Sequence, residues 1–115
     1  MTNAMEIEQR DRVLIVRLKG RLDANAVEEI RDQLKAIDVP QVVMNFSEVS
    51  FIDSSGLGLV VLTFRRIREK GGNMTLCGLC PKVRTIFELT RLHRVFDIYD
   101  SEELAVAAAE SELNA

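Results

Sequence analysis

The sequence predicts an α/β fold, a single domain with a mixed, mostly parallel β-sheet of about five strands, an N-terminal hairpin and about four helices. Short apolar runs of strand length alternate with segments whose apolar residues recur every three or four positions, as they do in amphipathic helices. Strands separated by helical crossovers favour parallel pairing, with the hairpin as the antiparallel part. The chain has 115 residues, a length typical of one domain with one core, and shows no repeats and no interdomain linker.

The N-terminal part of the chain predicts a hairpin followed by a helix. The two strands are Glu6 to Gln9 and Val13 to Lys19, and Gly20 ends the second. Asp23 is a candidate N-cap for a helix from Ala24 to Ile37, because an aspartate oxygen can accept hydrogen bonds from the free N–H groups of a first turn.

The middle of the chain predicts the central strand and the second helix. Pro40 blocks any continuation of the first helix, and residues 41–46, QVVMNF, are too apolar for an edge strand. A loop from Ser47 to Asp53 then leads to Ser54 and a long apolar helical pattern, which the run Lys-Gly-Gly at 70–72 closes.

The C-terminal part predicts two more strands and two more helices. Asn73 to Cys77 and Val95 to Tyr99 are the strands, and Pro81 fits the first turn of the third helix. Ser101 is the N-cap candidate of the fourth helix. The weak apolar face of that helix consists of Leu104, Ala105, Ala108 and Leu113.

Composition excludes several classes of partner. A net charge of -3 with 29% charged residues leaves neither a basic excess nor a long acidic tail, so we expect no nucleic-acid partner. No apolar run approaches the ~20 residues that cross a bilayer, and the first ten residues are polar and acidic, unlike a signal peptide. We therefore expect a cytoplasmic protein without a membrane partner.

The two cysteines form a motif that is typical of redox proteins. Cys77 and Cys80 make a CxxC between a predicted strand and a predicted helix, which is the layout of thioredoxin-like redox sites. The residues before Cys77 lack the aromatic context of those enzymes, and Pro40 precedes the pair instead of following it. One cysteine pair and one histidine are too few for the usual closed zinc site, so we expect no metal and no cofactor.

The densest group of unusual residues runs from Phe51 to Gly58. Asp53 or Ser54 can serve simply as a helix cap, but capping does not explain Gly58, since a glycine there costs about 0.8–1.0 kcal/mol relative to alanine. A partner that approaches the backbone closely would explain it. His93 is the only histidine, so Ser54 lacks the base that a nucleophile needs, and we interpret Ser54 as the substrate of another enzyme.

Helical geometry separates the leucines of this segment. Successive residues of a helix are roughly 100° apart around its axis, so Leu57 and Leu59 cannot both lie on the stripe that faces the core. We expect Leu57 to lie on that stripe and Leu59 to lie outside it. Leu59 is therefore predicted to be an exposed anchor for a partner. The predicted core stripe consists of Leu57, Val60, Val61 and Phe64.

Three stretches together resemble the STAS domain of anti-sigma factor antagonists. They are VVMNFSEVSFIDSSGLG at 42–58, Gly-Arg-Leu-Asp at 20–23 and Gly-Gly-Asn-Met at 71–74. The most specific element is the D-S-[ST]-G-[LVI]-G loop after an apolar strand. The resemblance implies a single STAS domain over residues 5–111, with short termini at 1–4 and 112–115.

The resemblance also implies a partner-switching function. The unphosphorylated protein would bind an anti-sigma factor that is also a serine kinase and so release a sigma factor, phosphorylation of Ser54 by that kinase would break the complex, and a PP2C-type phosphatase would reset it. The chain would then be a kinase substrate and not an enzyme. A STAS scaffold, or a subunit of another signalling or transport assembly, stays open as an alternative. The expected partner-binding residues are Asp23, Asp53, Ser54, Ser55, Gly56, Leu57, Gly58 and Leu59.

Overall fold

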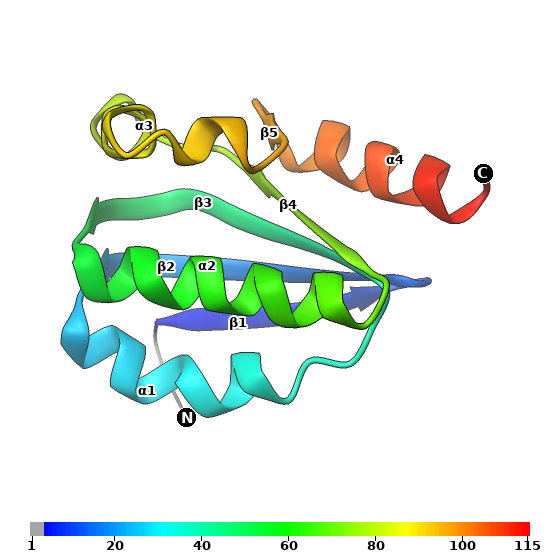
Figure 1. Cartoon of the computed structure of the whole chain (residues 1–115), viewed down its shortest axis with the longest axis horizontal. Coiled ribbons are helices and arrows are strands. Elements are labelled where there is room, and N and C mark those ends of the chain that lie inside the picture. Colours follow the sequence, from blue (N-terminus) through cyan, green and yellow to red (C-terminus); the bar gives the residue numbers. More distant parts are fainter. Residues whose placement is uncertain (1–3) are drawn as a thin grey trace.

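The computed structural model describes residues 4–115, which form a five-stranded sheet with helices on both faces (Figure 1). β1 pairs antiparallel with β2, and every later pair is parallel, so the predicted mixed sheet with an N-terminal hairpin is confirmed. The predicted terminus at 1–4 lies outside the described residues except for Ala4. The strands lie in chain order: β1 (Met5–Arg10), β2 (Val13–Leu22), β3 (Gln41–Ile52), β4 (Asn73–Cys77) and β5 (Ile98–Tyr99).

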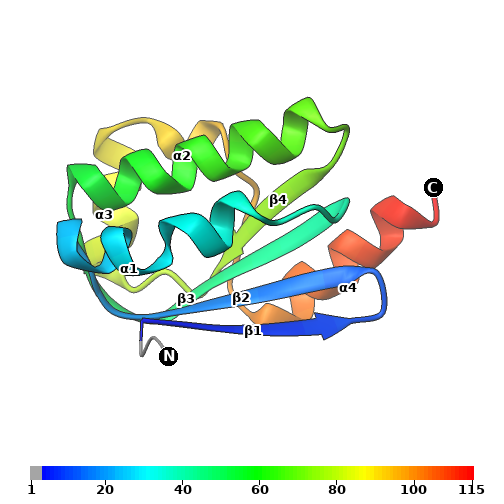
Figure 2. The ribbon, with the colours of Figure 1, turned by 90° about the horizontal axis from the view of Figure 1, so that it is seen from below.

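The helices divide between the two faces of the sheet. Buried side chains of α1, α2 and α3 form one core cluster with the sheet, and those of α4 form a second cluster on the opposite face. Figure 2 shows α1 and α2 together on one side of the strands and α4 on the other. Within residues 4–115 the helices are α1 (Ala24–Lys35), α2 (Ser54–Glu69), α3 (Pro81–Leu89) and α4 (Glu102–Leu113), with a 3-10 turn, η1 (Leu92–Arg94), before β5.

Two strands extend further than the sequence predicts. β2 continues past Gly20 and β3 continues through the predicted loop, because the two strands pair in parallel as far as Leu22 and Ile52. Between Arg17 and Lys19, and again between Gly20 and Arg21, the register shifts so that β3 accommodates one extra residue each time. The buried residues Phe46, Val49 and Ile52 are therefore three apart, and the two-residue alternation that identifies a strand is lost.

The C-terminal region also differs from the prediction. The expected strand from Val95 shortens to β5, because η1 occupies the residues just before it. Ser101 caps α4 as predicted, since its hydroxyl oxygen accepts a hydrogen bond from the Leu104 N–H at 3.2 Å. Leu104 was predicted to face the core and is 55% exposed, so that prediction was wrong. The buried face of α4 consists instead of Ala105, Val106 and Ala109.

Candidate functional site

Two helices begin side by side where β2 and β3 end, at the left of Figure 1. Asp23 and Asp53 cap them with nearly the same backbone geometry, φ −111° in both. The Asp23 carboxylate accepts from the N–H groups of residues 25 and 26 at 3.1 and 3.2 Å, and Asp53 accepts from the Gly56 N–H at 3.0 Å. The Asp53 N–H donates to the Leu22 carbonyl at 3.3 Å, which ties the two strand ends together. The predicted cap at Asp23 is confirmed, and of the two candidates for the second cap, Asp53 and Ser54, the structure has Asp53.

Ser54 is the first residue of α2 and its side chain is exposed. Ser55, beside it, is exposed too, while Asp53 is half-buried. Within residues 4–115 the Ser54 hydroxyl makes no hydrogen bond, because the neighbouring carboxylate of Asp53 already provides the cap. The first N–H groups of a helix lack intrahelical partners and carry the positive end of its dipole. An exposed hydroxyl at that point can take a charged group without disturbing the fold.

The two glycines of the first turns have different causes. A Cβ on Gly56 would lie 2.3 Å from the Leu22 carbonyl oxygen and 2.8 Å from the Ile52 side chain, so the close packing of α2 against the strand ends requires a glycine there. A Cβ on Gly58 would meet nothing within 4 Å, and that residue is exposed. The fold explains Gly56 but not Gly58, for which close approach of a partner stays a prediction.

Leu59 does not point to solvent. It is only 4% exposed and belongs to the core between α2 and the sheet, so the prediction of an exposed anchor was wrong. The close contact at Gly56 sets the rotation of α2 and turns Leu59 inward together with Val60 and Thr63. Leu57, predicted to face the core, is half-buried at the edge of that interface.

A further group of residues lies beside this edge and was not identified from the sequence. The Arg21 guanidinium carbon sits 3.9 Å from the centroid of the Phe51 ring, and the Lys82 Nζ lies 5.7 Å from the same centroid. Arg21 Nε also lies 3.7 Å from the second carboxylate oxygen of Asp23. Arg21 and Phe51 lie in stretches that carry the STAS resemblance, whereas Lys82 does not. Because the three residues come from the ends of two strands and the start of α3, no local pattern indicates that their side chains meet.

The two cysteines do not form a redox site. Cys77 is fully buried under α4, and burial, aided by the charges of Glu102 and Glu103, raises the pKa of its thiol to about 12. Cys80 packs on the opposite face of the sheet, where its Sγ lies 3.6 Å from the Val49 carbonyl oxygen. A redox thiol needs a depressed pKa, so the structure contradicts the thioredoxin-like alternative.

The start of α4 is held to the sheet by a charged network on the face away from Ser54. Arg17 donates to both Glu102 carboxylate oxygens, at 2.8 and 2.9 Å, and Asn45 donates to one of them at 2.9 Å. The bonds from Arg17 hold the pKa of Glu102 below its usual range, and those to Glu102 and Glu8 raise the pKa of Arg17. The network fixes the face that α4 presents to the sheet, which is why Leu104 points outward.

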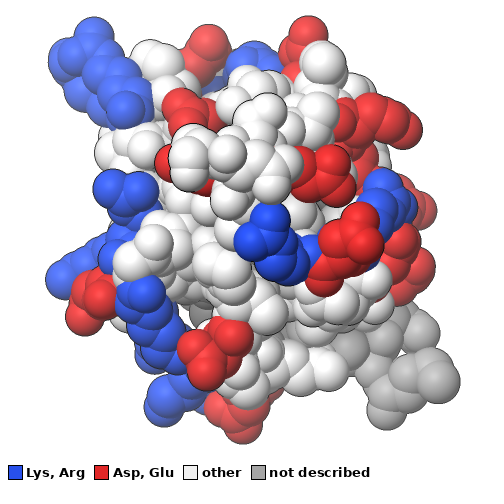
Figure 3. All heavy atoms as spheres, turned by 90° about the vertical axis from the view of Figure 1, so that its right-hand side faces the viewer, with Lys and Arg blue, Asp and Glu red and all other residues white. Residues whose placement is uncertain are grey.

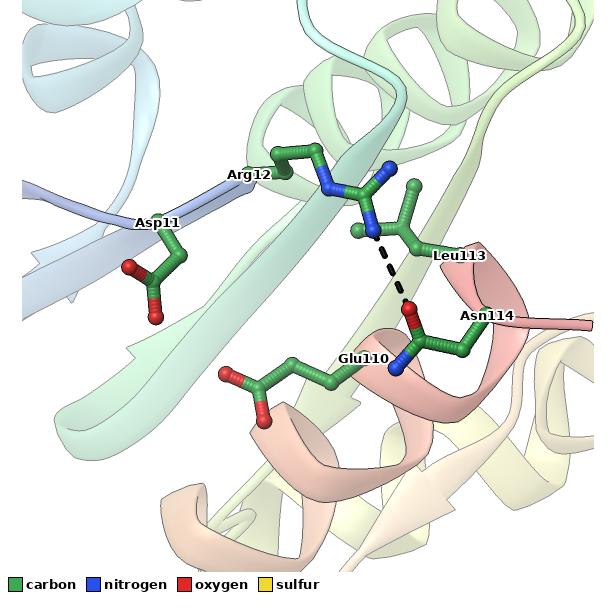
Figure 4. A pocket seen from close by; sticks show the side chains of 5 residues that line it. All are labelled: Asp11, Arg12, Glu110, Leu113 and Asn114. Carbon is green, nitrogen blue, oxygen red and sulfur yellow. Dashed lines mark hydrogen bonds between the residues drawn. The ribbon is translucent and has the colours of Figure 1, made fainter.

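At the end of the molecule opposite to Ser54, the described residues form a polar pocket. Figure 3 views that end, with many Lys and Arg along its left edge and Asp and Glu distributed over both sides. The pocket lies between the β1–β2 turn and the end of α4, and Arg12 donates to Asn114 across it at 3.1 Å (Figure 4). Its lining residues are Asp11, Arg12, Glu110, Leu113 and Asn114.

Within residues 4–115 no three His, Cys, Asp or Glu side chains are grouped in a way that would hold a metal ion. Each helix there is too short or too polar to span a lipid bilayer.

Known proteins that are similar to this chain include a protein family and a named relative. The family model described as "STAS domain" matches residues 4–105. The chain is 35% identical over 114 residues to a protein of Paenibacillus polymyxa named anti-sigma F factor antagonist, covering 96% of this chain and 97% of the relative.

Solved structures agree with that match. The anti-sigma factor antagonist SpoIIAA in its unphosphorylated form has a TM-score of 0.81 and 32% identity, covering 94% of this chain and 97% of that one. The Bacillus cell fate determinant SpoIIAA in the phosphorylated form has a TM-score of 0.75 and 32% identity, covering 91% and 98%.

Proposed function

The chain belongs to the STAS domain family, and we propose that it acts as an anti-sigma factor antagonist whose binding to an anti-sigma factor is abolished by phosphorylation of Ser54. In its unphosphorylated form it binds an anti-sigma factor with serine kinase activity and so releases a sigma factor. The same kinase phosphorylates Ser54, and a PP2C-type phosphatase restores the free hydroxyl. The protein is a regulatory substrate of these enzymes, and its place of action is the bacterial cytoplasm.

The observation that carries the proposal is the position of Ser54. Its hydroxyl is exposed, has no hydrogen-bond partner within residues 4–115 and stands at the start of a helix that Asp53 already caps. A kinase can therefore reach the oxygen without unfolding α2. The fold gains from the phosphate, since a negative group at a helix N-terminus is worth ~0.3–1 kcal/mol.

The switch then acts on the interface and not on the fold. Phosphate adds about −1.5 to −2 charges at pH 7 and places them beside the carboxylate of Asp53, near the helix start that Asp23 caps. Burying that charge under a partner without compensation costs several kcal/mol. At ~1.4 kcal/mol per factor of ten, a loss of about 4 kcal/mol weakens binding nearly a thousandfold. The remaining partner-binding residues of the proposal are Ser55, Gly56, Leu57 and Gly58.

The experiment that tests the proposal is site mapping of the kinase reaction. The chain is incubated with ATP and each purified anti-sigma factor kinase of the source organism, and phosphopeptides are identified by mass spectrometry. We expect one modified residue, Ser54, and no modification of the Ser54→Ala variant. The Ser55→Ala variant is the matched control, because it removes the adjacent exposed hydroxyl and keeps Ser54.

Two results would contradict the proposal at different levels. Modification mainly at Ser55 or Ser50 would retain the circuit and overturn the assignment of the site. Absence of both binding and modification with every such kinase would overturn the function itself.

A further inference from the structure

Phe51 is an aromatic residue that the core does not use. The chain has five phenylalanines, and four of them pack with one another in the core or against it, as the ring pairs 46–87, 64–96 and 87–96. Phe51 belongs to neither core cluster and pairs with no other ring in residues 4–115. It is half-buried, and the cations of Arg21 and Lys82 lie over its ring.

Arg21 is held in a defined orientation by this ring. Its guanidinium lies 3.9 Å from the ring centroid, within the range of a cation–π contact, and Asp23 approaches its Nε at 3.7 Å. Its side chain nevertheless stays 61% exposed. The other carboxylate oxygen of Asp23 is the one that caps α1. A guanidinium oriented in this way keeps N–H groups free for a second acceptor, and a carboxylate matches their fork geometry.

Lys82 supplies a second cation to the same ring from a different element. It lies in the first turn of α3, is exposed, and forms no ion pair within the described part of the chain. Two cations and one ring are thus brought together by β2, β3 and α3. They lie at the end of the sheet where β2 and β3 finish, the end that also carries Asp23 and Ser54.

We propose that a binding site for a carboxylate side chain of the partner protein is formed by Arg21, Phe51 and Lys82. This site selects which anti-sigma factor binds. The inference rests on the proposed function and extends its interface to a positively charged side. The argument for a partner is continuity, because Arg21 contacts Asp23 at the Ser54 edge. The surface around Ser54 then presents the acids Asp23 and Asp53 beside these cations. A matching partner must place positive charges opposite the two acids and a negative charge opposite the cations.

The test is a set of charge variants titrated against the purified anti-sigma factor that phosphorylates this chain. We expect Arg21→Glu to weaken binding about tenfold or more, mainly through slower association that depends on salt. Lys82→Glu acts in the same direction, and Phe51→Leu weakens binding while keeping both charges. Arg31→Glu is the matched control, since it makes the same charge change on an exposed arginine in the middle of α1. Replacing the opposing acid of the partner by Lys should restore binding to Arg21→Glu.

The outcomes separate this inference from the proposed function. If phosphorylation abolishes binding but Arg21→Glu and Arg31→Glu bind alike, the carboxylate site is overturned and the switch stands. If Arg21→Glu binds normally but changes the 31P titration of phosphorylated Ser54, the cations serve the phosphate of this chain, and the carboxylate site is again overturned. If the parent chain binds no anti-sigma factor, both proposals fail.

Discussion

Two strand-to-helix junctions of this molecule each carry a residue of a reactive type in the sequence, but they differ in whether that residue is exposed. At the β3–α2 junction the side chain that follows the strand, Ser54, is exposed, and the cap is supplied by its neighbour. At the β4–α3 junction the candidate nucleophile, Cys77, is still part of the strand and lies under α4, while Cys80 occupies the cap position without a side-chain cap bond. A reactive residue type at a strand end therefore indicates chemistry only if its side chain leaves the core.

The largest expected effect concerns the thiol of Cys77. Burial raises the pKa of Cys77 to about 12 against ~8.5 for a free cysteine, so its thiolate fraction at pH 8 is more than a thousandfold lower. Since the thiol is also fully buried, alkylation should be far slower than that of a free thiol. The measurement compares single-thiol variants, Cys80→Ser and Cys77→Ala, with a cysteine peptide. A rate for Cys77 near that of the peptide would remove the contrast between the junctions.

The same pKa shift predicts how stability depends on alkaline pH. The folded state keeps the Cys77 proton longer than the unfolded state does, so stability is fully present below the unfolded pKa and falls as pH rises from about 9 toward 12. Denaturant titrations of the parent and Cys77→Ala over that range test this. The parent should lose more stability than the variant, and equal losses would contradict the shift.

Gly56→Ala should be the most destabilising single substitution at the β3–α2 junction. Its Cβ would lie 2.3 Å from backbone oxygen, which cannot move away as a side chain would, so we expect a loss of about 3 kcal/mol in the free energy of unfolding. Chemical denaturation measures it. A loss below about 0.5 kcal/mol would show that the start of α2 is not packed as described.

Glu102→Gln tests how firmly α4 covers Cys77. Loss of the charged bonds from Arg17 should cost about 2 kcal/mol at neutral pH, with Glu103→Gln, an exposed neighbour, as the control. Because the pKa of Glu102 is lowered in the folded state, its contribution is present at neutral pH and lost as pH falls through that pKa, below 4.5. The stability of the variant should therefore depend less on acid pH.

Faster alkylation of Cys77 in the Glu102→Gln variant would link the network to the burial of the thiol, and an unchanged rate would contradict that link.

Gly58→Ala has the smallest expected effect on folding and the opposite sign. Since its Cβ meets nothing within 4 Å, the gain in helix propensity should stabilise the chain by about 0.8–1.0 kcal/mol. Partner binding should weaken if the backbone is approached closely there. Stabilisation together with unchanged binding would leave Gly58 unexplained.

Much of the fold could be predicted because local signals agreed with tertiary packing. Asp23, Asp53 and Ser101 are caps in the sequence pattern and in the structure, and β4 has its predicted bounds. The last part of β3 could not be predicted, because two register shifts place its buried residues three apart and its polar residues resemble a loop.

The candidate site was only partly predictable for a related reason. The rotation of α2 depends on the contact between Gly56 and Leu22, a long-range approach that helical periodicity does not contain, so Leu59 was assigned to the wrong side. The cluster around Phe51 joins residues far apart in the chain. The sequence stretches that carry the resemblance contain Ser54, Arg21 and Phe51, but only the structure shows that the ring meets the two cations.

The central claim is that one phosphate on Ser54 switches binding without unfolding the chain. The most direct measurement is a calorimetric titration of the anti-sigma factor with the unphosphorylated and the Ser54-phosphorylated chain, with melting curves of both forms. We predict a Kd nearly a thousandfold weaker for the phosphorylated form and an equal or slightly higher Tm. Equal Kd values, or weaker binding accompanied by a large fall in Tm, would contradict the account.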